Sequence, residues 1–123
     1  MTKFESILNA ALASLISEGW TDSVTAETWD SEDEEVNGTV ITEGTEFVRH
    51  TVSLPTSGAP EYAPTYGPDV EIFAEHDRYR ITTMMTWGLD TLAEGSLSAP
   101  DLSQESLVEL VRKAERESRE SGS

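Results

Sequence analysis

The sequence predicts an α+β domain with an N-terminal helix, an antiparallel β-meander of four or five strands, and a C-terminal helix. Near each end of the chain, apolar residues recur at three- and four-residue spacing, the period of a helix. Between these ends, short runs of alternating apolar and polar residues are separated by turn residues, which is typical of consecutive antiparallel strands. The length of 123 residues fits a single domain, expected over residues 1–120, with a frayed tail at 121–123.

The first helix is predicted over residues 2–18. Thr2 and Glu5 have the spacing of a capping box, and Gly19 stands where a left-handed C-terminal cap is expected. The apolar stripe comprises Phe4, Ile7, Leu8, Ala11, Leu12, Leu15 and Ile16. We expect this stripe to cover one face of the sheet, because a helix this apolar on one side must bury that side.

Residues 23–87 are predicted to hold the strands. Asn37 and Gly38 mark a two-residue hairpin, because both central positions of its turn require positive φ, and a second turn is predicted at residues 43–44. The expected inner face of the strand at 45–54 comprises Val48, His50, Val52 and Leu54. A strand through Val70 and Ile72 should turn at residues 75–77. The returning strand should present Tyr79, Ile81, Thr83, Met85 and Trp87 on one face.

A loop rich in proline and tyrosine, residues 55–68, interrupts the meander. Its prolines recur at every fourth position, which excludes helix and central strand and favours an exposed, extended backbone. Tyrosine is enriched at protein interfaces, and a backbone stiffened by proline loses less entropy on binding. The predicted partner-binding residues of this loop are Pro60, Tyr62, Pro64 and Tyr66. The alternative is an ordinary surface loop.

The C-terminal helix is predicted to begin after Pro100, with Ser103 as its N-cap, while a short helical turn is predicted before it at residues 89–93. Arg112, Arg116 and Arg119 follow at helical spacing and form a basic stripe. We expect this stripe to dock onto an acidic neighbour, either another copy of the chain or another protein. The alternative is pairing with acids of the same helix.

The charge of the chain is strongly negative. Asp and Glu total 24 against 8 Lys and Arg, so the formal charge is 8 − 24 = −16, and only Lys3 and Lys113 are lysines. This composition resembles that of haloarchaeal proteins and the proteins of their viruses. The resemblance implies salt adaptation: at molar salt the Debye length is about 3 Å, so repulsion between carboxylates is screened. The alternatives are a DNA-mimicking inhibitor and an ordinary acidic protein.

Composition also excludes several kinds of partner and compartment. A surface this acidic should repel nucleic acid and anionic membranes. The chain shows neither the apolar run of a signal peptide nor an apolar stretch long enough to span a bilayer. We therefore expect a cytoplasmic protein, or a virion component if the protein is viral, with protein partners and neither nucleic-acid nor membrane binding.

The sequence offers little catalytic or metal-binding chemistry. Without cysteine there is no thiolate zinc site and no thiol nucleophile. Residues 33–40 match half of a calcium loop, but position twelve falls on Gly44, and a hairpin explains the segment with fewer assumptions. His50 and His76 are too few for a catalytic zinc site, and no nucleophile elbow or phosphate loop occurs. We expect no catalytic residue, metal, cofactor or small-molecule substrate.

The predicted architecture is similar to that of the small tail-completion and tail-terminator proteins of tailed viruses. The features that carry the resemblance are the helix at 4–16, the meander, the loop at 59–68 and the helix at 107–119. The resemblance implies a virion neck or tail subunit that assembles as a ring of copies of itself. We therefore expect a non-catalytic structural, assembly or adaptor protein that acts through protein–protein contacts in a high-salt setting. The alternatives are an acidic regulatory binding module, meaning a DNA mimic or an inhibitor of a basic partner, and a small enzyme.

Overall fold

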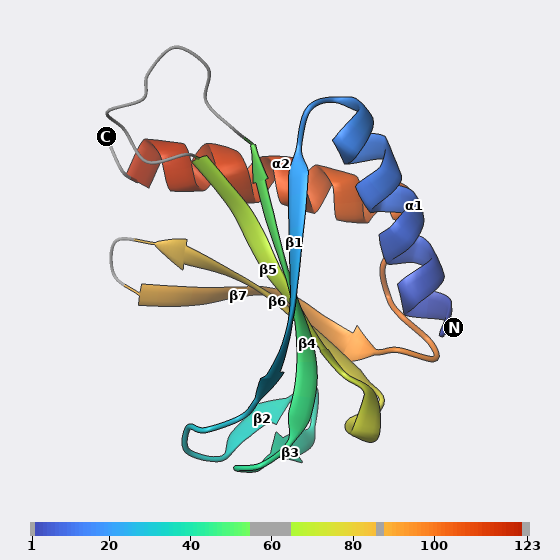
Figure 1. The fold of residues 1–123 in the computed structure, drawn as a ribbon, viewed down its shortest axis with the longest axis vertical. Helices are drawn as coiled ribbons and strands as arrows, with labels where there is room; N and C mark the ends of the chain where they lie inside the picture. Colours follow the sequence, from blue (N-terminus) through green and yellow to red (C-terminus); the bar gives the residue numbers. More distant parts are fainter. Residues whose placement is uncertain (1, 55–64, 86–87, 122–123) are drawn as a thin grey trace.

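The computed structural model describes residues 2–54, 65–85 and 88–121. Five antiparallel strands form one sheet in the order β1-β4-β5-β6-β7, and β2 and β3 form a separate hairpin (Figure 1). The elements are α1 Lys3–Ser17, β1 Thr21–Thr28, β2 Glu34–Val36, β3 Thr39–Ile41, β4 Glu46–Leu54, β5 Thr65–Phe73, the short 3-10 helix η1 Ala74–His76, β6 Arg78–Met85, β7 Gly88–Ser96 and α2 Gln104–Ser121. The prediction of an α+β fold with a helix at each end and an antiparallel meander is confirmed.

Both long helices pack on one face of the sheet, where the larger hydrophobic core lies. Phe4 and Leu15 of α1 are fully buried there, as are Val70 and Ile81 of the sheet and Leu107 of α2. The Phe4 ring stacks on Tyr79 with 4.0 Å between ring centroids and 11° between ring planes. This stack joins α1 to the middle of the sheet.

A second, smaller core lies on the opposite face of the sheet. Phe47 and Phe73 are the chain neighbours of Val48 and Ile72, so their side chains point away from the helices. The residues of this core are Trp29, Val36, Ile41, Phe47 and Phe73. Because Val36 and Ile41 come from β2 and β3, burying these side chains holds the hairpin against the sheet.

The local signals at the helix ends and in the hairpin are confirmed. The Glu5 N–H donates to Thr2 Oγ1 at 3.2 Å, and the Glu5 carboxylate accepts from the Thr2 N–H at 3.3 Å, which completes the capping box. Asn37 and Gly38 have φ values of 47° and 83° and form the turn between β2 and β3. The Ser106 N–H donates to Ser103 Oγ at 3.2 Å, as expected of an N-cap.

The predicted helical turn at residues 89–93 is wrong, because this segment belongs to the edge strand β7. Ile81 pairs with Ala93 and Thr82 with Thr91, so Leu92 is an extra residue and forms a β-bulge. The bulge breaks the two-residue alternation of a strand. As a result, apolar residues stand at 89, 92 and 93, which is the three- to four-residue spacing of one helix face.

Gly67 lies where three elements meet, and a side chain there would collide with them. An added Cβ would stand 2.9 Å from the Val52 carbonyl oxygen, 3.0 Å from the Trp20 ring and 3.2 Å from Val111. We therefore expect Gly67→Ala to lower the free energy of unfolding by about 1–3 kcal/mol, as overpacking of a tight site does. Denaturant unfolding in molar KCl would measure it. A loss within error would show that Trp20 and Val111 can move aside.

Candidate functional site

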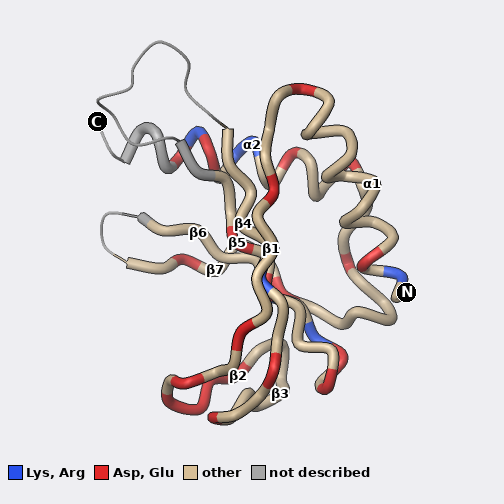
Figure 2. Tube along the Cα trace, viewed as in Figure 1, with Lys and Arg blue, Asp and Glu red and all other residues tan. Residues whose placement is uncertain are grey.

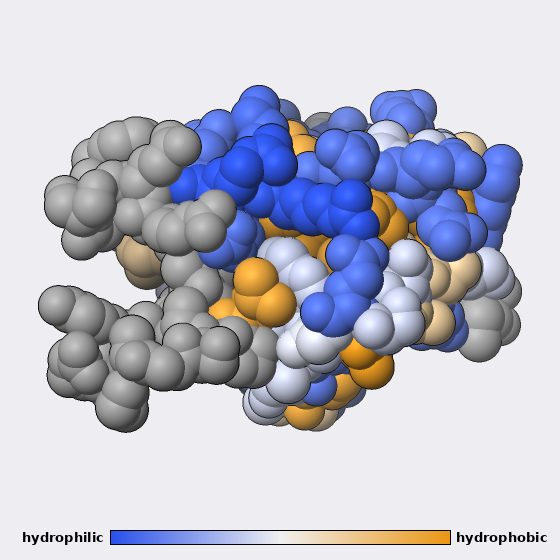
Figure 3. All heavy atoms as spheres, turned by 90° about the horizontal axis from the view of Figure 1, so that it is seen from above, coloured by the Kyte–Doolittle hydropathy of each residue, from blue (hydrophilic) through white to orange (hydrophobic). Residues whose placement is uncertain are grey.

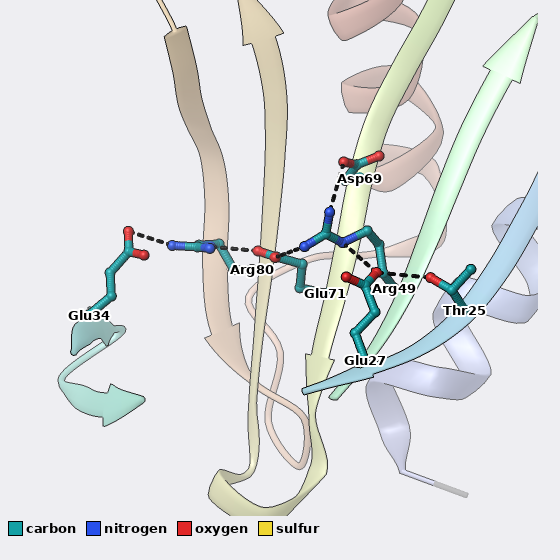
Figure 4. Close-up of polar contacts among 7 residues, drawn as sticks. All are labelled: Thr25, Glu27, Glu34, Arg49, Asp69, Glu71 and Arg80. Carbon is teal, nitrogen blue, oxygen red and sulfur yellow. Dashed lines mark hydrogen bonds and ion pairs between the residues drawn. The ribbon is translucent and has the colours of Figure 1, made fainter. Parts of the chain in front are cut away.

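A row of charged side chains crosses the sheet on the face away from the helices (Figure 4). Arg49 of β4 is the cross-strand partner of Glu71 of β5, which in turn is the partner of Arg80 of β6. Arg80 Nε donates to Glu71 Oε1 at 2.7 Å, and Arg49 Nη2 donates to Glu71 Oε2 at 3.2 Å. At one end of the row, Arg80 Nη1 lies 2.6 Å from Glu34 Oε1. Since Glu34 belongs to β2, the row ties the hairpin to the sheet.

The centre of this row is buried, and its opposite charges are paired. The side chains of Glu71 and Arg80 are only 4% and 6% exposed. Burial opposes the charge of Arg80, but its hydrogen bond and ion pair with Glu71, and its contact with Glu34, outweigh that penalty and raise the pKa of Arg80. Both carboxylate oxygens of Glu71 accept from arginines of the neighbouring strands, so its charge is compensated within the molecule. The row is therefore structural.

The other end of the row is more loosely held. Arg49 Nε lies 3.2 Å from Glu27 Oε2, close enough for an ion pair, although the angle is not that of a hydrogen bond. Arg49 Nη1 lies 4.0 Å from Asp69 Oδ2. Burial of Asp69 outweighs its hydrogen bond from Thr51 and the attraction of Arg49, so the pKa of Asp69 is raised. The described residues at this end of the row form ion pairs, and they do not form a cluster of catalytic groups.

The two histidines lie apart in the fold. His50 Nδ1 is 3.0 Å from Asp22 Oδ2, across the β1–β4 pair, whereas His76 belongs to η1. The segment that matches half of a calcium loop forms the β2–β3 hairpin and therefore has strands on both sides. Within the described ranges, no three or more His, Asp or Glu side chains are grouped so that they could hold a metal ion.

The predicted partner-binding residues divide into two groups. Pro60, Tyr62 and Pro64 lie outside the described residues, and of Tyr66 only the backbone is described, which pairs with Ser53. The prediction of a loop over residues 55–68 is wrong for residues 65–68, which belong to the central strand β5; Pro68 is tolerated there because the pairing with β4 is irregular at this point. Arg112 makes an ion pair with Glu18, the residue at the end of α1, with Nη2 at 2.6 Å from Oε2. Arg112 therefore joins the two helices of the same molecule.

The rest of the basic stripe lies farther along α2. Arg116 is exposed, and the side chain of Arg119 lies outside the described part of the chain. Within the same helix, Arg112 Nη1 also lies 3.6 Å from Glu109 Oε1, and Lys113 Nζ lies 3.9 Å from Glu117 Oε1. The Arg112 side chain is itself 38% exposed, so both Arg112 and Arg116 reach the surface.

One edge of the five-stranded sheet has neither a proline nor a bulge, and its charged residues are Asp22 and Glu27. Strand β1 lies at the edge of the sheet, and all of its eight residues pair with β4 without a register shift. Its sequence contains no proline, lysine or arginine, the residues that blunt natural edges, and Val24 is 55% exposed. Figure 1 looks onto this edge, with β1 foremost. The opposite edge, β7, carries the bulge at Leu92.

A groove of about 510 Å³ lies beside this edge, on the helix side of the sheet. Ala26 of β1, Val48 of β4 and Ile72 of β5 give it an apolar floor. Its acids include Glu46 and Glu75, which are exposed, and Glu5, which caps α1; no lysine or arginine is among its described lining residues. The groove therefore combines an apolar floor with negative charge and begins at the open strand.

A second, smaller hollow of about 250 Å³ lies beside the charged row, and its lining includes Trp29, Glu71 and Arg80. Seen from above, polar side chains cover most of the described area, and hydrophobic ones show only in separate places between them (Figure 3). Acidic residues crowd the segment that leads into β2 (Figure 2). No helix in the described ranges is both long and apolar enough to cross a membrane.

Sequence reasoning did not identify the edge or the groove. The alternation of Val24, Ala26 and Thr28 with polar residues predicts a strand, but it does not show that the strand has a neighbour on one side only. The one available signal is the absence of proline and cationic residues from β1. Comparisons with known proteins add no assignment: no family model, curated protein or solved structure matches this chain.

Proposed function

We propose that the protein is a non-catalytic assembly or adaptor protein in a high-salt setting, and that the open edge of β1 is its principal contact surface. A virion neck or tail subunit is the leading example of this class. The observation that carries the proposal is the regular edge strand β1, whose outward backbone groups can pair with a strand from another chain.

The charges near β1 support this use of the edge. Glu27 of β1 makes an ion pair with Arg49 of β4, and Asp22 of β1 lies within hydrogen-bond distance of His50 Nδ1. An incoming strand therefore meets less uncompensated negative charge here than the net charge of −16 suggests. The large burial of Glu71 and Arg80 supports a structural use of the charged row rather than acid–base catalysis.

The alternative, a DNA mimic or an inhibitor of a basic partner, draws on the acids at residues 27–35. Two of these acids are occupied within the molecule, since Glu27 pairs with Arg49 and Glu34 with Arg80. The segment thus presents fewer free carboxylates than its sequence suggests. Phosphate mimicry needs a regular series of free charges, so the geometry favours the open edge.

A test of the edge compares Val24→Lys with Val24→Thr. Lysine places a charge on the exposed edge, while threonine keeps the β-branched shape, so both variants should fold. In molar KCl we expect both the wild type and Val24→Thr to associate through the β1 edge. Sedimentation velocity would detect self-association, and a binding assay with the neutral strand peptide Thr-Gln-Thr-Val-Thr-Gln-Thr-Val would detect pairing with another strand. Val24→Lys should lose this association. A wild-type protein that stays monomeric and leaves the peptide unbound would contradict the proposal.

A further inference from the structure

The groove beside β1 limits the kind of strand that fits this edge. We propose that the partner is an extended segment of another protein with arginine or lysine at alternate positions, and that these side chains enter the groove. This inference rests on the proposed function, because it assumes that a strand pairs with β1. It adds the chemistry of the partner.

The position of the groove carries the first part of the argument. A strand added to β1 would lie about 4.8 Å from it, with alternate side chains on the helix side of the sheet. There they would stand beside Ala26 and Thr28, which line the groove. Main-chain hydrogen bonds give such a complex its affinity, and pockets for alternate side chains give it its specificity.

The lining of the groove selects the side chain. The aliphatic part of arginine or lysine can cover an apolar floor such as Ala26 and Val48 while its charged end reaches a polar rim. Glu46 is the cross-strand partner of Thr28, one strand in from the edge, and Glu75 lies at η1. Both carboxylates are exposed and have room for a new cationic neighbour.

The same chemistry argues against a second copy as the occupant. An identical strand β1 would bring Asp22 and Glu27 but no cation, because residues 21–28 contain neither lysine nor arginine. The groove would then face further negative charge or neutral side chains. The acidic lining of the groove therefore favours a different protein over a second copy.

The test uses three labelled peptides with blocked termini, which differ only at positions 2 and 6, on the same face of an extended strand. The basic peptide is Thr-Arg-Thr-Val-Thr-Arg-Thr-Val, and glutamine or glutamate replaces arginine in the other two. Fluorescence anisotropy is measured in about 1 M KCl, where a Debye length of about 3 Å removes long-range attraction but leaves contact ion pairs. We expect the arginine peptide to bind about tenfold more tightly than the glutamine peptide. The glutamate peptide should bind most weakly.

Two double variants separate groove contacts from net charge. Glu46→Gln with Glu75→Gln should abolish the advantage of the arginine peptide. Glu32→Gln with Glu43→Gln removes the same charge from exposed acids outside the groove lining and should leave the advantage unchanged. If both double variants weaken binding of the arginine peptide equally, the groove is not the binding site. Equal binding of all peptides would overturn this inference while leaving the edge as a contact surface. If none of the peptides binds, the inference is overturned. If, in addition, the protein stays monomeric in sedimentation velocity, the proposed function is overturned as well.

Discussion

Glu71→Gln is expected to lower the free energy of unfolding by about 3–5 kcal/mol, the range seen when one partner of a buried ion pair is removed. Glutamine keeps the size of glutamate but not its charge, so Arg80 would stay buried beside a neutral amide. Arg49 would lose the same acceptor charge. Urea unfolding at neutral pH measures the loss, and it should be similar at low and high KCl because buried pairs are poorly screened.

The matched control replaces the pair rather than breaking it. A double variant, Glu71→Met with Arg80→Met, removes both buried charges together and should recover part of the stability lost in Glu71→Gln. Arg49 keeps its ion pair with Glu27, and the Glu34 side chain, which is 49% exposed, can be hydrated. Trp29 reports on the hairpin in both variants, because it packs against Val36 and Ile41 in the smaller core. A cost below about 1 kcal/mol for Glu71→Gln, the value of an exposed pair, would show that water reaches this row.

Phe4→Ala is expected to lower the free energy of unfolding by about 3–5 kcal/mol, as other Phe-to-Ala changes in protein cores do. The Phe4 side chain is fully buried and stacks on Tyr79, so its removal leaves a cavity and breaks an aromatic contact. The backbone of Phe4 also donates to the Leu97 carbonyl oxygen at 3.0 Å, a bond that the substitution retains. The cavity therefore accounts for the loss.

Ile16→Ala supplies the control in the same helix. Ile16 is 53% exposed, so its truncation should lower the free energy of unfolding by less than about 1 kcal/mol. Thermal unfolding of the two variants under the same salt conditions compares them directly. Equal losses would mean that α1 is stabilised by helix propensity rather than by its contact with the sheet.

The parts of the fold that could be predicted from the sequence rest on short-range interactions. Thr2 and Glu5 cap the helix that follows them, and Asn37 and Gly38 form a turn that few other pairs adopt easily. In each case the physical cause lies within a few residues of its effect. These elements were therefore visible in the sequence.

The parts that could not be predicted depend on residues far apart in the chain. Glu71 and Arg80 read as solvent-facing strand residues, and they are buried because β2 and β3 pack over that face. Arg112 reads as part of a surface stripe, yet its partner, Glu18, lies 94 positions away. The edge position of β1 depends on the order of all five strands, and the groove depends on three of them and α1.

In the proposed addition of a strand at β1, the bulge at Leu92 on the opposite edge has a consequence for how far the sheet can grow. In molar salt the repulsion that keeps acidic proteins apart is screened, so a sheet with two receptive sides could grow without end into fibres. Of the two edges of the five-stranded sheet, β1 is regular and β7 is interrupted. Strand addition then stops after one step, giving a pair or a one-to-one complex. A closed ring would have to use a different contact between neighbours.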